Sequence, residues 1–167
     1  SYFWGVGFDQ GDNDDNKSKL KRGQAQVKAS WLFRASGNLF IGPTFSFDYI
    51  NAHHIDNPEL LGGQRHTTTN IGAGLTLLTA PKRGMYLSLQ QVCRPRFMAN
   101  HYAFSSTALR TSGYIPISSA TLIALDFRTE FNYGNPAWGM MAQLGGSNTM
   151  RGYYEGRYRD KNKIETQ

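Results

Sequence analysis

Apolar and polar residues alternate along most of this chain, and this alternation constrains its fold more than any other feature. Between residues 24 and 33, for example, Ala25, Val27 and Ala29 alternate with Gln24, Gln26 and Lys28. Successive side chains of a β-strand point to opposite faces, so a period of two predicts strands with one apolar and one polar face. The pattern predicts seven strands, at residues 2–8, 24–33, 39–49, 70–77, 85–90, 103–116 and 123–131, and the opening of an eighth at 162–167.

Charge follows the same alternation. In and next to the predicted strands between residues 24 and 133, the charged residues all stand opposite the apolar stripe, and they are Lys28, Arg34, Asp48, Arg94, Arg96, Arg110, Asp126, Arg128 and Glu130. A face this hydrophilic does not suit the dry core of a small sandwich, but it suits the watered interior of a barrel. We therefore expect Arg94, Arg96, Arg110, Asp126, Arg128 and Glu130 to be charges of a barrel lumen.

The connections alternate between long and short. Long polar loops are predicted at 9–23, 51–66 and 135–160, with a shorter one near 98–102, and tight turns at 35–38, 80–83 and 117–118. Antiparallel up-and-down strands produce this order, and a transmembrane barrel with long loops at one end is its commonest cause. A soluble amphipathic sheet is the alternative, but most of these runs supply the ~9 to 11 residues that cross a bilayer obliquely.

Composition sets outer limits on function. The 167 residues contain 18 Lys and Arg against 12 Asp and Glu, a net charge of +6 that fits an anionic surface, a nucleic acid or a basic cavity. No run approaches the ~20 apolar residues of a spanning helix, which excludes a helical membrane protein. The one cysteine, Cys93, allows no internal disulfide. Without an initiator Met or a targeting segment, we expect a piece of a longer protein.

A glycine-rich motif stands near the end of the chain. The segment 144–162 resembles the motif of the bacterial surface antigen family, the outer-membrane barrel superfamily of BamA, TamA, two-partner secretion transporters and patatin-like autosecreted lipases. The matching residues are Gly145, Gly146, Asn148, Met150, Arg151, Gly152 and Tyr153, and residues 82–89 resemble the family's turn-to-strand element. In that family the motif lies on a long loop that folds back into the barrel, where its arginine is anchored to acidic residues.

This resemblance implies a fold and a function. Residues 1–167 are expected to be part of one all-β, antiparallel, up-and-down transmembrane barrel, incomplete in this chain, with the motif on the 135–160 loop. The expected protein inserts or translocates proteins at the bacterial outer membrane, as an assembly factor or an autosecretion barrel. Its expected partners are membrane lipid, unfolded outer-membrane or secreted clients, and periplasmic or lipoprotein components; neither a cofactor, an enzymatic activity nor a nucleic acid is expected.

The motif also has a physical reading of its own. Its glycines permit tight backbone turns, and Arg151 offers a rigid donor fork to a carboxylate, so the loop is expected to act as a conformational lock. Asp126 and Glu130 are the acidic candidates on the preceding strand, and acids further downstream are the family's usual partners. Arg157 and Arg159 are expected to be exposed. A phosphate- or RNA-binding loop is the alternative, although the GxxxxGK[ST] spacing is missing.

Other groups of residues give only weak evidence for a metal site or a catalytic site. A metal could be held by the loop residues His53, His54, His66, Asp56 and Glu59, but a solvated loop is favoured. The run Asp9, Asp12, Asp14 and Asp15 lacks the Gly and Glu of a calcium loop. Asp126 and Glu130 are expected to join a ladder of salt bridges rather than an acid-base pair, and no catalytic triad stands out. A soluble, basic β-sheet binding module remains the rival from another class.

Overall fold

The computed structural model describes residues 2–3, 17–61, 63–82, 85–98, 100–144 and 157–166. Its strands are β1 (Tyr2–Phe3), β2 (Ser18–Lys19), β3 (Lys21–Ser30), β4 (Phe33–Ser36), β5 (Leu39–His53), β6 (Thr67–Lys82), β7 (Met85–Arg94), β8 (Phe104–Pro116), β9 (Leu122–Gly134), β10 (Ala142–Gln143), β11 (Arg159–Asp160) and β12 (Asn162–Thr166). Short 3₁₀-helices stand at η2 (Pro58–Leu61), η3 (Arg96–Met98) and η4 (Trp138–Met140). Among the described residues, no helix has the length and apolar character to cross a membrane.

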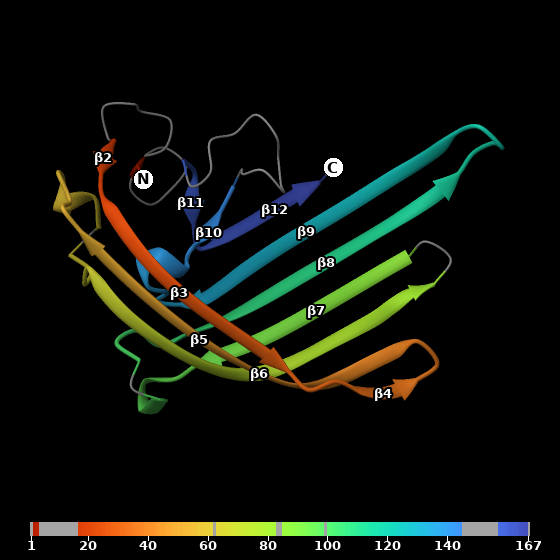
Figure 1. The fold of residues 1–167 in the computed structure, drawn as a ribbon, viewed down its shortest axis with the longest axis horizontal. Coiled ribbons are helices and arrows are strands. Elements are labelled where there is room, and N and C mark those ends of the chain that lie inside the picture. The colour runs from red at the N-terminus through yellow and green to blue at the C-terminus, as the bar shows by residue number, and fades with distance from the viewer. Residues whose placement is uncertain are drawn as a thin grey trace.

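One antiparallel sheet dominates the fold and is curled into an open half-barrel (Figure 1). Its strands follow the order β12-β9-β8-β7-β6-β5-β3, and β4 continues beside β5. From β5 to β9 each strand pairs with the next along the chain, which is the up-and-down connectivity expected from the loop lengths. The expected all-β, antiparallel, incomplete barrel is confirmed.

The long connections gather at one end of this sheet and the short turns at the other (Figure 1). Residues 54–66, 95–103 and 135–161 join strands at the first end, which we call the loop end. Residues 37–38, 83–84 and 117–121 connect strands at the opposite end, the turn end. Antiparallel pairing requires this separation, because every second connection returns to the same end.

Two of the predicted strands differ in kind from those observed, and others differ at their ends, since β5 reaches His53 in the predicted 51–66 loop and β6 reaches Lys82 in the predicted 80–83 turn. Tyr2–Phe3 pairs with Ser18–Lys19 in a separate two-stranded sheet, and the rest of the predicted 2–8 strand lies outside the described residues. Residues 21–23, predicted as loop, open β3, and the predicted 24–33 strand is interrupted between β3 and β4. There the N–H of Trp31 donates to the carbonyl of Pro43 (3.0 Å), a residue that cannot donate to the ladder in return.

The pairing register separates the two faces of the sheet. Directly paired residues share a face, and the row Ala29, Phe45, Ala73, Cys93, Ser105 and Tyr133 runs across the strands on the convex face. Large apolar side chains are exposed on that face: Val27, Phe33, Ile41, Phe45, Tyr49, Leu75, Met85, Leu89, Ile115, Ile123, Leu125, Tyr133 and Ile164. Leu75, for instance, is 58% exposed.

The concave face has the opposite character. Its buried residues include Thr44, Ser46, Asp48, Asn70 and Arg94, which are polar or charged. In most soluble sheets the apolar face is the buried one. On β5 to β7, around Asp48 and Arg94, the sheet therefore buries its polar face and exposes its apolar face.

Glycines on the concave face allow the sheet to curl. An added Cβ at Gly74 would lie 1.8 Å from the carbonyl oxygen of Gln91, and one at Gly42 would lie 1.9 Å from that of Trp31. Both contacts are with backbone, which cannot turn aside as a side chain can. The close approach of the strands at these points thus requires glycine.

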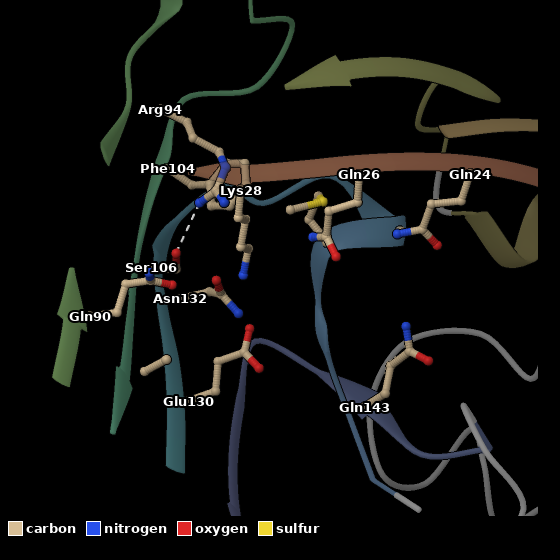
Figure 2. Close-up of a pocket in the computed structure, with 13 residues that line it drawn as sticks. Gln24, Gln26, Lys28, Gln90, Arg94, Phe104, Ser106, Glu130, Asn132 and Gln143 are labelled. Atoms are coloured by element: carbon tan, nitrogen blue, oxygen red, sulfur yellow. Dashed lines mark hydrogen bonds between the residues drawn. The ribbon is translucent and has the colours of Figure 1, made fainter. Parts of the chain in front are cut away.

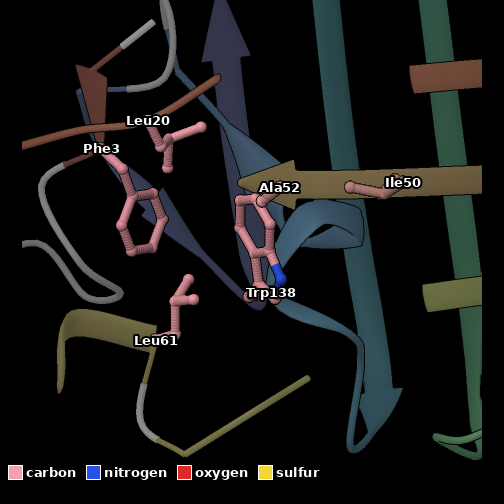
Figure 3. Packing of buried hydrophobic residues seen from close by; sticks show 6 residues of the cluster. All are labelled: Phe3, Leu20, Ile50, Ala52, Leu61 and Trp138. Carbon is pink, nitrogen blue, oxygen red and sulfur yellow. The ribbon is translucent and has the colours of Figure 1, made fainter. Parts of the chain in front are cut away.

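A small hydrophobic cluster closes the loop end (Figure 3). It joins residues far apart in the sequence, and its members are Phe3, Leu20, Ile50, Ala52, Leu61 and Trp138. Trp138 of η4 thus lies near Ile50 of β5, whereas the strand that precedes η4 is β9. The segment after β9 therefore crosses the concave side of the sheet at this end.

Candidate functional site

A buried ion pair lies on the concave face. Arg94 of β7 and Asp48 of β5 approach to 3.6 Å, Nη2 to Oδ2, with side chains 3% and 0% exposed. Arg94 also donates to the hydroxyls of Ser106 (2.9 Å) and Ser46 (3.3 Å), and its guanidinium lies 4.8 Å from the centre of the Phe104 ring. These contacts hold the side chain against two strands besides its own, β5 and β8.

Further charges continue across the sheet. Asp126 is 2.6 Å from Arg128 and 3.4 Å from Arg110, so the ion pairs expected for Asp126 are present. On the next strand, Lys163 lies 3.6 Å from the buried carboxylate of Glu165. The pairing register sets Glu165 opposite Arg128 and Lys163 opposite Glu130, so opposite charges face each other along β9 and β12.

A polar cavity of about 240 Å³ lies over the concave face (Figure 2). Lys28 enters it from β3 and Glu130 from β9, while Arg94 stands in its wall. Most of the remaining lining is uncharged and polar, and it includes Gln24, Gln26, Gln90, Ser106, Asn132 and Gln143. Segment 139–143 covers part of this cavity, so the 135–160 loop contributes to it directly.

The predicted site residues divide into three groups. Arg94, Arg110, Asp126, Arg128 and Glu130 occupy the concave face. Arg96 does not, because β7 ends at Arg94 and Arg96 lies exposed in η3; the alternation was extended past the end of its strand. Gly145, Gly146, Asn148, Arg151, Gly152 and Tyr153 fall outside the described residues, as does the predicted loop lock.

The two flanks of the motif loop are described, and they are paired with each other. Ala142 and Gln143 of β10 pair with Asp160 and Arg159 of β11. The N–H of Leu144 extends this pairing by donating to the carbonyl of Tyr158 (3.0 Å). The loop therefore leaves and returns at a single place.

A clasp of hydrogen bonds fastens the start of this loop to the 54–66 connection. The Gln64 amide accepts from the Trp138 N–H (2.6 Å) and donates to the Pro136 carbonyl (3.3 Å). The Trp138 indole N–H donates to the Arg65 carbonyl (3.1 Å), and the Arg65 N–H donates to the Tyr102 hydroxyl (3.0 Å). The three loop-end connections are thereby tied together.

Arg159 was expected to be exposed, and this expectation was wrong. The side chain is buried, its guanidinium lies 5.3 Å from the Phe3 ring and 5.6 Å from the Trp138 ring, and Nη1 donates to the Trp138 carbonyl (2.9 Å). Burial, and secondarily the nearby Arg22, lowers the pKa of Arg159 to about 9. No sequence pattern marks this residue, because its ring partners come from residues 3 and 138.

The histidine loop shows no metal arrangement. The rings of His53 and His54 meet edge to face with centroids 5.2 Å apart, and His54 has a positive φ of 54°. Within the described residues, no group of three or more His, Cys, Asp or Glu side chains could hold a metal ion. The predicted Asp9–Asp15 cluster lies outside those residues.

Comparison with known proteins adds no relative: no family model, curated protein or solved structure matches this chain. The site must therefore be interpreted from its own geometry. That geometry is a polar surface joined by ion pairs, with segment 139–143 over part of it.

Proposed function

We propose that this chain is part of a β-barrel of the bacterial outer membrane that inserts or translocates proteins. The single observation that carries the proposal is the reversed polarity of the sheet, with apolar side chains exposed on the convex face and the Arg94–Asp48 ion pair buried on the concave one. In water this arrangement is unfavourable, because it exposes the surface that the hydrophobic effect would bury. Around a water-filled lumen in lipid, both faces meet their preferred solvent.

Strand length and loop placement support a membrane-spanning role. β5 has 15 residues, β6 has 16, and β8 and β9 have 13 each, which exceeds the ~9 to 11 needed for a tilted crossing. The long connections lie together at one end, as in barrels whose long loops face outward. Membrane lipid is accordingly the proposed partner of the convex face.

The polypeptide-handling part of the proposal rests on the resemblance of the motif loop. Its flanks lie over the concave side, where a loop could control passage through a lumen. Clients would be unfolded outer-membrane or secreted proteins, with periplasmic or lipoprotein components assisting. Work of this kind requires neither a cofactor nor nucleotide hydrolysis.

Three carboxylates are candidate anchors for Arg151. Asp126 already pairs with Arg110 and Arg128, which makes it the weakest candidate. Glu130 enters the polar cavity. Glu165 is buried and lies 3.6 Å from Lys163, but neither of its carboxylate oxygens makes a hydrogen bond. A buried carboxylate of this kind favours an arginine partner, so we rank Glu165 and Glu130 above Asp126.

The orientation of the sheet is tested by placing a charge on each face. Phe45→Arg or Leu125→Arg should impair insertion by about 2 to 4 kcal/mol near the bilayer midplane, because the convex face meets lipid. Gln24→Arg, on the concave face of β3, is the control and should be mild. Ser46, on the concave face of β5, is unsuitable as a control because its hydroxyl accepts a hydrogen bond from Arg94.

Insertion is measured by folding into lipid vesicles, read by heat-modifiable migration in gels. Equal effects at the two faces would refute the orientation. A protein that stays monomeric in buffer without detergent would instead favour the soluble binding module.

A further inference from the structure

Arg159 is an unusual cation. It is 4% exposed, and within the described residues no carboxylate pairs with it. A buried charge without a counter-ion is costly, so other contacts must offset its desolvation. The two aromatic faces of Phe3 and Trp138 and the carbonyl of Trp138 provide those contacts.

Arg159 stands at a point of the chain where these contacts link two separate segments. It closes the β10–β11 pairing at the return of the motif loop, opposite Gln143, while Trp138 stands just before the loop begins. One side chain therefore joins the end of the loop to its start. Through Gln64 and Arg65, Trp138 is joined in turn to the connection between β5 and β6.

We propose that Arg159 is a positioning residue, and that its guanidinium, held by the Phe3 and Trp138 rings and by the Trp138 carbonyl, fastens segment 138–143 over the concave face. Release of this cation frees segment 139–143, which covers the polar cavity, and opens the cavity at the loop end. Arginine suits the role because its guanidinium can contact both rings while one of its N–H groups donates to the Trp138 carbonyl. Lysine keeps the charge but loses the planar donor fork.

The inference rests on the proposed function only in assuming that the fastened loop acts in a lumen. Its test therefore measures loop position separately from activity. A cysteine at Gln143, in a Cys93→Ala background of the intact protein in detergent, reports the covered cavity through its rate of modification by a water-soluble maleimide. A cysteine at Ser88, on the concave face of β7, reports the sheet itself.

Arg159→Met should raise the modification rate at position 143 by about tenfold or more and leave position 88 unchanged, as local opening predicts. Arg159→Lys should give an intermediate rate. The matched control is Lys161→Met, which makes the same change on an exposed side chain two residues away and should stay within about twofold.

An unchanged rate at position 143 would overturn the proposal. Equal increases at positions 143 and 88 would also overturn it, since they would make Arg159 a general stabiliser of the fold. Barrel assembly or export is then measured with the same variants. If Arg159→Met opens the cavity while export continues unchanged, the positioning role stands and the proposed action of the loop in export fails.

Discussion

At the scale of single residues, the concave face depends on charges that are satisfied by several partners at once. Arg94 illustrates this, because it touches Asp48, two serine hydroxyls and an aromatic ring. Asp48 in turn accepts from the Gln26 amide. A buried ion pair contributes little to stability when compared with apolar residues of similar size. Removal of one partner, however, leaves the other as a buried, unpaired charge.

Arg94→Ala should therefore lower the free energy of unfolding by about 3 to 5 kcal/mol, because it leaves the Asp48 carboxylate buried and unpaired. The double variant Asp48→Asn, Arg94→Gln should lose less, since it leaves no net charge behind. Urea unfolding in detergent micelles measures both. Arg34→Ala, at an exposed arginine, is the control and should change stability by about 0.5 kcal/mol or less. An Arg94→Ala effect no larger than this control would contradict the prediction.

At the scale of strands, curvature is set by where the backbone can approach a neighbour. Gly74 and Gly42 stand where a side chain would meet a carbonyl oxygen, and Gly72 stands where it would meet Val92 and Arg94. The three lie on β5 and β6, at the centre of the curled sheet. Small residues on the concave face thus let the strands bend around the polar interior.

Gly74→Ala should destabilise the protein by about 1 to 3 kcal/mol, as overpacking does, because the added methyl group must displace backbone of β7. Gly23→Ala offers a matched control on β3, since the nearest atom to its added Cβ is 3.9 Å away. Thermal unfolding of the two variants in the same detergent compares them. A loss at Gly23 as large as that at Gly74 would show that the curl does not depend on this close approach.

The sequence predicts best those strands in which apolar and polar residues alternate over a long run. Alternation located the strands from β5 to β9, and it placed Asp48 and Arg94 on one face. It could not find the break at Trp31, because the hydrogen bond to Pro43 depends on the partner strand. Nor could it reveal the burial of Arg159, which depends on residues more than a hundred positions apart in the sequence.

At the scale of the whole molecule, the sheet has two different ends. The loop end is bound together by the Trp138 clasp and the hydrophobic cluster, whereas the turn end has only short connections. If the sheet spans a membrane, the two ends lie in different compartments. Loop-end and turn-end residues should then differ in their access to reagents that cannot cross lipid.

Cysteines at Asp56 and Asn135 should be labelled by an impermeant maleimide in intact cells, and a cysteine at Ser119 in the 117–121 turn should not. All three positions are exposed, so protection at Ser119 would come from the membrane rather than from burial. Labelling after cell lysis verifies that Ser119→Cys is reactive, and a Cys93→Ala background removes the native thiol. Labelling of Ser119→Cys in intact cells at the rate of Asp56→Cys would contradict the arrangement.

The place of Cys93 gives the molecule a built-in reporter. It is the only cysteine in the sequence, it is exposed, and it shares the convex face with Phe45 and Tyr133. A nitroxide attached there would sample the medium that bathes this face without any engineered substitution. The relaxation of this nitroxide by dissolved oxygen, compared with its relaxation by a water-soluble nickel complex, would report how deeply Cys93 lies in lipid.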